Sequence, residues 1–171
     1  MAETKHGICV KENLSGTHNG VDLVSVRYMV DTTATAIDNG NVVLVGAFES
    51  NSREVRKATA PAKNSAKADI ALIATSEVIY DERLQGDLAN FVNEAGAVAN
   101  AYRLEKPHQI FAVTGEALDG SEARIVGAVV ELQAGTKLLA VASNTSGSTK
   151  IGSIVDVYTK RGVTYFAIET C

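Results

Sequence analysis

Apolar positions in this chain fall in short segments that are separated by polar turns. Residues 23–30 are rich in β-branched residues, and residues 41–46 form a second apolar segment after the turn signal Asp38-Asn-Gly40. Residues 54–59 can pair back onto that segment. Residues 68–75 form a continuous apolar run whose length and isoleucines favour a buried strand. The first half of the chain therefore predicts four strands.

The terminal region, residues 109–170, shows the clearest period of two. Its predicted strands are 109–114, 126–132, 137–142, 151–159 and 163–169, with turns near Gly120, Gly135, Gly147 and Gly162. Strands that follow one another so closely predict antiparallel pairing in a small barrel or sandwich.

Residues 84–104 form the single stretch with a helical period, because apolar residues recur there at steps of three and four. Gly86 and Gly96 each lower helix stability by about 1 kcal/mol. We expect a helical segment near 84–104, with strand or loop as the alternative.

Residues 1–20 contain three glycines and many Asn, Ser and Thr residues, so they offer few apolar groups to offset the entropy of ordering. They predict a flexible, extended N-terminal arm that becomes ordered against a partner. Residues 21–171 predict a single β-rich domain. The expected fold class is mainly β (α+β): a small antiparallel β-barrel or sandwich with one helix and this arm.

Composition narrows the possible functions. The chain has 171 residues, of which 46% are hydrophobic and 21% charged, and this balance is typical of one folded domain. Sixteen basic against twenty acidic residues give a net charge of −4, which argues against a nucleic-acid-binding protein. No apolar run approaches the about 18 residues of a membrane span, and residues 1–7 lack the apolar stretch of a secretory signal. We expect a soluble protein made in cytoplasm.

No familiar catalytic motif occurs: the phosphate-binding loop, the dinucleotide fingerprint, the zinc-protease motif and the nucleophile elbow are all missing from the sequence. His6, His18 and His108 fall in polar segments. A metal ion could recruit the first two, but solvated side chains are the preferred interpretation. Cys9 and Cys171 are expected to be unrelated free thiols, with a disulfide between them as the alternative. The sequence therefore predicts no enzyme, no cofactor and no catalytic or metal-binding residue.

Two charged segments stand out. Residues 80–83 (Tyr-Asp-Glu-Arg) place Asp81 and Glu82 beside Arg83, and we interpret them as acidic residues before a helix N-terminus with a local arginine partner. A basic stretch could face a partner's acidic surface or a nucleic acid, although a solvated loop is the commoner explanation. It contains Arg53, Arg56, Lys57, Lys63 and Lys67, opposed only by Glu54.

Three aromatic residues, Tyr158, Tyr165 and Phe166, lie on predicted terminal strands. Aromatic residues on paired strands commonly contact each other across the strands. We therefore expect core and cross-strand packing rather than stacking on nucleic-acid bases.

Several phrases together resemble the small capsid decoration, or cement, proteins of tailed bacteriophages that infect Gram-positive bacteria. These phrases occupy residues 36–41, 80–83, 93–96, 101–104, 130–138 and 165–168, and so span most of the chain from residue 20 onward. The resemblance implies a virion protein that binds the major capsid protein on the outer face of the assembled head and stabilises the shell. It also implies a possible homo-oligomer, such as a trimer, and no catalytic residues.

Two other classes stay open. A tail-tube or head–tail connector subunit would form rings and would need long hairpins lining a lumen. A small-ligand-binding β-barrel, or an enzyme, would need a concave pocket with converging polar groups.

Overall fold

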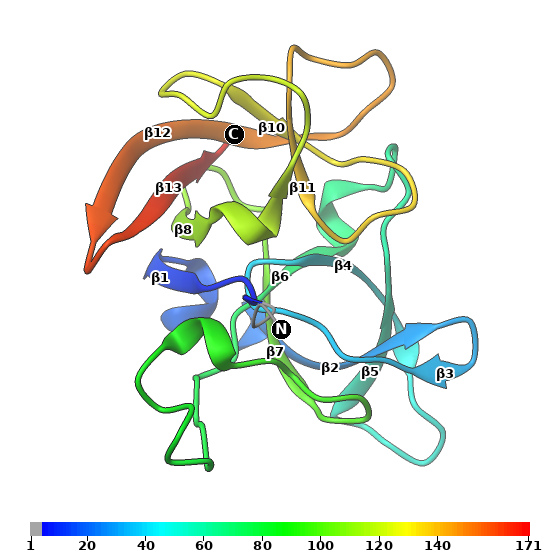
Figure 1. Cartoon of the computed structure of the whole chain (residues 1–171). Helices are drawn as coiled ribbons and strands as arrows, with labels where there is room; N and C mark the ends of the chain where they lie inside the picture. The colour runs from blue at the N-terminus through cyan, green and yellow to red at the C-terminus, as the bar shows by residue number, and fades with distance from the viewer. Residues whose placement is uncertain (1–4) are drawn as a thin grey trace.

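The computed structural model describes residues 5–171 and folds them into two sheets (Figure 1). The smaller sheet contains β2 (Leu23–Val30), β3 (Thr33–Ala34), β4 (Val42–Phe48), β5 (Val55–Thr59), β6 (Ile70–Ile73) and β7 (Ala99–Arg103). The larger sheet contains β1 (Cys9–Asn13), β8 (Ile110–Thr114), β9 (Leu118–Asp119), β10 (Val129–Glu131), β11 (Leu139–Ala142), β12 (Lys150–Lys160) and β13 (Val163–Thr170). Short 3₁₀ turns are η1 (Ser15–Thr17), η2 (Gly20–Asp22), η3 (Lys67–Asp69), η4 (Leu88–Asn90) and η5 (Gly115–Ala117). The predicted mainly β fold is confirmed.

Five strands of the smaller sheet close into a barrel in the order β2-β5-β4-β6-β7, with β7 pairing back onto β2. The β2–β5 pair is parallel, and the other pairs of the barrel are antiparallel. A barrel of so few strands has a narrow interior. Several of the side chains inside it are accordingly small. The buried residues are Ala58, Ala71, Ala99 and Ala101 together with Val26, Tyr28, Val43 and Ile73. The interior is filled by side chains.

The larger sheet runs in the order β1-β8-β13-β12-β10-β11-β9 and is antiparallel except for the β9–β11 pair. Its longest element is the β12–β13 hairpin, which reaches away from the body of the molecule (Figure 1). Arg161 and Gly162 both have positive φ, of 53° and 78°, as a tight hairpin turn requires.

The two sheets share one hydrophobic core. Side chains alternate between the faces of a strand, so β6 serves both sides. Ile70 and Leu72 pack in the cluster that also contains Phe111 and Ile154 of the larger sheet, whereas Ile73 packs in the barrel interior. The barrel is thus packed directly against the larger sheet.

Residues 84–104 do not form the predicted helix. They contain the single turn η4, an irregular stretch and then β7, which pairs with both β2 and β6. Gly96, with a φ of +84°, turns the chain just before β7. Pairing on both edges of β7 closes the barrel, and this tertiary gain outweighs the weak helical pattern.

The described part of the predicted arm, residues 5–20, is packed rather than free. Strand β1 pairs with β8, and Ile8, Cys9 and Leu14 are buried. Strand pairing and these three buried side chains hold the segment against the core, although the composition around them is polar and rich in glycine. Residues 1–4 lie outside the described residues.

Most predicted strands are confirmed, namely β2, β4, β5, β6, β8 and the series from β10 to β13, whereas β9 lies where a turn was predicted. The barrel lies elsewhere than expected, since strands between residues 23 and 103 form it and the terminal strands form the open sheet. Cys9 is buried and Cys171 is exposed, and both are free thiols as predicted.

Candidate interaction surface

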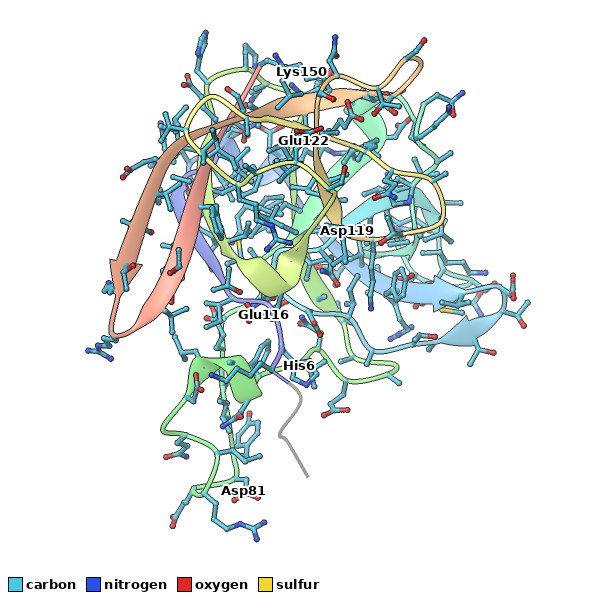
Figure 2. All side chains as sticks on the ribbon, turned by 45° about the horizontal axis from the view of Figure 1, so that its top comes forward. His6, Asp81, Glu116, Asp119, Glu122 and Lys150 are labelled. Atoms are coloured by element: carbon cyan, nitrogen blue, oxygen red, sulfur yellow. The ribbon has the colours of Figure 1, made fainter. Side chains whose placement is uncertain are left out.

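The segment between β6 and β7 is the candidate functional region; we call residues 76–98 the 76–98 loop. It projects from the barrel, with Asp81 far from the body of the molecule (Figures 1 and 2). Large apolar side chains are exposed along it, namely Val78, Tyr80, Leu84, Leu88 and Val98. Tyr80 is 91% exposed. Exposed apolar groups gathered on one segment are typical of a contact surface.

All of these side chains except Leu88 line a hollow of about 540 Å³. Ile79, Phe91 and Val92 line it from within the same loop. The loop therefore presents both projecting apolar groups and a recess between them, the two features that a protein partner can engage.

Asn39 holds the start of the loop in place. Its side chain is fully buried, donating to the Thr75 carbonyl oxygen at 2.8 Å and to Glu77 Oε1 at 2.9 Å. Its oxygen accepts from the Thr75 N–H at 3.0 Å and from Asn93 Nδ2 at 3.2 Å. One carboxamide thus makes four hydrogen bonds, its full complement of two donated and two accepted.

Asn93 holds the other end. Its backbone pairs with Ile37 in an antiparallel bridge, and its Nδ2 donates to the Ile37 carbonyl oxygen at 3.0 Å. The start of the loop and Asn93 near its end are therefore both attached to residues 37–39, so the base of the loop is held by the folded chain itself.

The N-terminal segment supports the middle of the loop. The His6 N–H donates to the Ala89 carbonyl oxygen at 2.8 Å, and His6 Nδ1 lies 2.9 Å from Asp38 Oδ1. Ile8 and Ala89 pack in one buried cluster. His6, considered above as a metal ligand, here links Asp38 to the loop.

The loop is acidic, with Glu77, Asp81, Glu82, Asp87 and Glu94 against Arg83 alone. Arg83 makes a two-pronged contact with Asp81, at 2.7 and 3.1 Å, and this contact holds the pKa of the Asp81 carboxyl below its usual range. The predicted local pairing is confirmed. The prediction that a helix begins after residues 80–83 is wrong. The next element is the 3₁₀ turn η4, which Asp87 caps.

The basic stretch does not form a second such projection. Arg56 stacks on Phe48 with its guanidinium carbon 3.9 Å from the ring centroid, and Lys67 donates to the Cys171 carbonyl oxygen. Lys57 lies on β5, and Lys63 lies in the connector before η3. The charges are spread over β5, a connector and η3.

The remaining sequence candidates lie away from the loop. His18 follows η1, and His108 lies with Nδ1 2.8 Å from Glu169 Oε1. Tyr158 stacks on Tyr165 across the hairpin with ring centroids 5.4 Å apart, which confirms the predicted cross-strand pair. Phe166 packs partly buried against the shared core.

Within residues 5–171, no three His, Cys, Asp or Glu side chains are grouped so that they could hold a metal ion. None of the helices in this range is long and apolar enough to cross a lipid bilayer. No protein-family model, curated protein or solved structure matches the chain. Its function is therefore inferred from its own residues.

The positioning roles of Asn39 and Asn93 could not be predicted from the sequence, since asparagine in a turn signal has a simpler explanation. A usable signal was present in the apolar residues 78–80, because Val78, Ile79 and Tyr80 interrupt an otherwise polar segment.

Proposed function

We propose that this chain is a phage capsid decoration protein that binds the major capsid protein on the outer surface of the assembled head. In this proposal it is made in the host cytoplasm, joins the virion at the capsid surface and stabilises the shell. The supporting observation is the 76–98 loop, an apolar projection whose two ends are fixed by Asn39 and Asn93. Two of the phrases that resemble decoration proteins, residues 80–83 and 93–96, lie within it.

A fixed loop suits this role on energetic grounds. Binding loses less conformational entropy when the contacting segment is already ordered. An exposed aromatic side chain such as Tyr80 is a favourable anchor, because it brings a large apolar area with few rotatable bonds. Many copies on one shell, associated for example as trimers, would strengthen attachment further by avidity.

The direct test is co-sedimentation of the purified protein with undecorated capsids. The paired substitution Tyr80→Ala and Leu84→Ala should weaken binding about thirtyfold, because loss of an interface anchor costs about 2 kcal/mol. The control is Ile125→Ala with Val126→Ala, which removes two exposed apolar side chains elsewhere, 62% and 60% exposed. Equal binding by both double variants would show that the 76–98 loop is not the contact.

The salt dependence of binding shows whether apolar or charged contacts hold the protein on the capsid. Raising salt from about 0.1 M to 1 M shortens the screening length from about 10 Å to 3 Å. Binding through buried apolar groups should mostly survive, whereas binding through the basic residues from Arg53 to Lys67 should be lost. Failure to sediment with capsids at either concentration would count against decoration itself.

One observation favours a second candidate. The long β12–β13 hairpin has the form expected of a tail-tube or connector subunit, in which hairpins line a lumen. Negative-stain images of the purified protein separate the two, since stacked rings would favour a tube and discrete monomers or trimers would favour decoration. The side-chain-filled barrel interior weighs against a ligand-binding barrel.

A further inference from the structure

The end of the molecule opposite the 76–98 loop carries a separate hollow. Its volume is about 660 Å³, within the range of about 300–1,000 Å³ that is common for binding sites. It is bordered by β9, β10, β11 and the loop that follows β11. Figure 2 labels Asp119 and Glu122 near this end, well away from Asp81.

Glu131, the last residue of β10, lines the hollow and is only 2% exposed. Its carboxylate accepts from one donor, the Thr145 N–H, at 3.0 Å to Oε2 and 3.3 Å to Oε1. In the part of the chain that the structure describes, no Lys, Arg or His nitrogen lies within 4.0 Å of it. Lys150 is its neighbour across the strands, and Lys63 lines the same hollow, but neither forms an ion pair with it.

A carboxylate can accept about four hydrogen bonds and is costly to bury unless a cation or further donors compensate it. Replacing water around a charge by one N–H leaves most of that compensation missing. Glu131 is therefore an anionic group that a cationic donor entering the hollow would satisfy.

The residues that line the hollow indicate which kind of cationic group fits it. Leu132, Ala140 and Val141 provide apolar surface, and Ser121, Gln133 and Ser148 provide hydrogen-bonding groups. Long basic side chains match this arrangement, since their stems pack on apolar surface while the charged head pairs with a carboxylate. We infer that this hollow binds the side chain of an arginine or lysine from a partner protein, with Glu131 as the group that receives the cation.

Hydrogen bonds to neighbouring segments hold the loop that borders the hollow. The loop that supplies Thr145 is attached at its far end, where the Thr149 N–H donates to the Lys63 carbonyl oxygen at 2.7 Å and Thr149 Oγ1 donates to the Ser65 carbonyl oxygen at 2.8 Å. The inference does not depend on capsid attachment by the 76–98 loop, because it concerns other residues at the other end of the molecule.

The test is an NMR titration of the full chain with n-butylguanidinium, followed at the Thr145 amide resonance. The neutral isostere N-butylurea is the matched ligand control. We expect a saturable shift with the cation and at least tenfold weaker binding of the urea. Equal shifts with both ligands, or no saturable shift at Thr145 with the cation, would overturn the inference without any variant.

Two variants sharpen the result. Glu131→Gln should weaken n-butylguanidinium binding at least tenfold. Glu122→Gln alters a carboxylate that accepts from Ser143 at the same end, and should leave binding within about twofold. Equal losses in both would show that general acidity, rather than Glu131, attracts the cation.

The source of the cation is tested with a capped Gly-Arg-Gly peptide. A partner's side chain arrives on a peptide backbone, so the peptide should bind at least as tightly as n-butylguanidinium. Binding of the small cation with exclusion of the peptide would overturn the assignment to a protein partner.

Discussion

The 76–98 loop and the β12–β13 hairpin both project from the body of the molecule, but they are held in different ways. The base of the hairpin pairs with β8 and β10, and its outer part is held by its own backbone ladder and by the stacked pair Tyr158 and Tyr165. The loop has little regular structure and is held at its two ends by side chains, above all that of Asn39. The outer part of the hairpin is thus held mainly by its own two strands, whereas the loop depends on Asn39, a residue 36 positions before Thr75, which adjoins the start of the loop.

This difference has a consequence for how each projection can change. Substitutions in the outer part of the hairpin remove contacts between neighbouring residues, so each should lower the stability only slightly. Removal of Asn39 leaves buried backbone groups without partners and should act on the whole loop at once.

The largest effect is expected from Asn39→Ala. The Thr75 N–H and carbonyl oxygen both lose their side-chain partner, and each unsatisfied buried group costs about 1–3 kcal/mol. Urea unfolding should show a loss of about 3–5 kcal/mol in the free energy of unfolding. The matched control is Asn90→Ala, which removes one exposed hydrogen bond within the loop and should cost less than about 1 kcal/mol. Similar losses for both would mean that Asn39 does not hold the loop.

The second-largest effect is expected at Gly40, which lies beside Asn39. Gly162 at the hairpin tip is its control, since both glycines have positive φ. A Cβ on Gly40 would lie 2.7 Å from Ala117 Cβ and 3.0 Å from Val113 Cγ1, whereas one on Gly162 would meet nothing within 4 Å. Gly40→Ala should lower the free energy of unfolding by about 2–4 kcal/mol through crowding and strain. Gly162→Ala should lower it by about 1 kcal/mol through strain alone. Equal losses in urea unfolding would contradict the crowding at Gly40.

A smaller, pH-dependent effect is expected from Tyr158→Phe. Burial, together with the hydrogen bond to Glu12, raises the pKa of Tyr158 to about 12. An unfolded tyrosine titrates near pH 10, so the stabilisation is fully present below pH 10 and is lost as pH rises toward 12. Loss of the hydroxyl should lower stability by about 1 kcal/mol at pH 7. The gap in melting temperature between wild type and variant should narrow from pH 9 to pH 11; a constant gap would refute the assignment.

The smallest effect is expected from Arg83→Ala. Asp81 and Arg83 lie in the exposed part of the loop, where solvent screens their pairing, so urea unfolding should not change measurably. The local effect should still be visible, because the pKa of the Asp81 carboxyl should rise toward its ordinary value when followed by NMR. An unchanged Asp81 titration would show that the pair does not form in solution.

The sequence predicted elements that are defined by neighbours in the chain. Alternation in residues 151–159 and 163–169 identified the β12–β13 hairpin, and Asn-Gly at residues 39–40 identified a turn. It did not predict the 76–98 loop, because the contacts of Asn39 with Thr75 and Asn93 join distant residues and leave no periodic pattern.

The same reason explains the error in residues 84–104. Apolar residues there recur at three- and four-residue steps because some face the partly open hollow and others complete the barrel through β7. Likewise Leu14 is one apolar residue among polar ones, yet it is fully buried because β1 brings it against the core.

The pairing of β1 with β8 also bears on synthesis of the chain on the ribosome. The barrel strands all lie between residues 23 and 103, so all of them are translated before residues 110–114. Cys9, by contrast, lies opposite Val113, and β1 has no partner strand until β8 has been made. The first strand to be translated therefore enters its sheet only after the barrel's last strand has been translated.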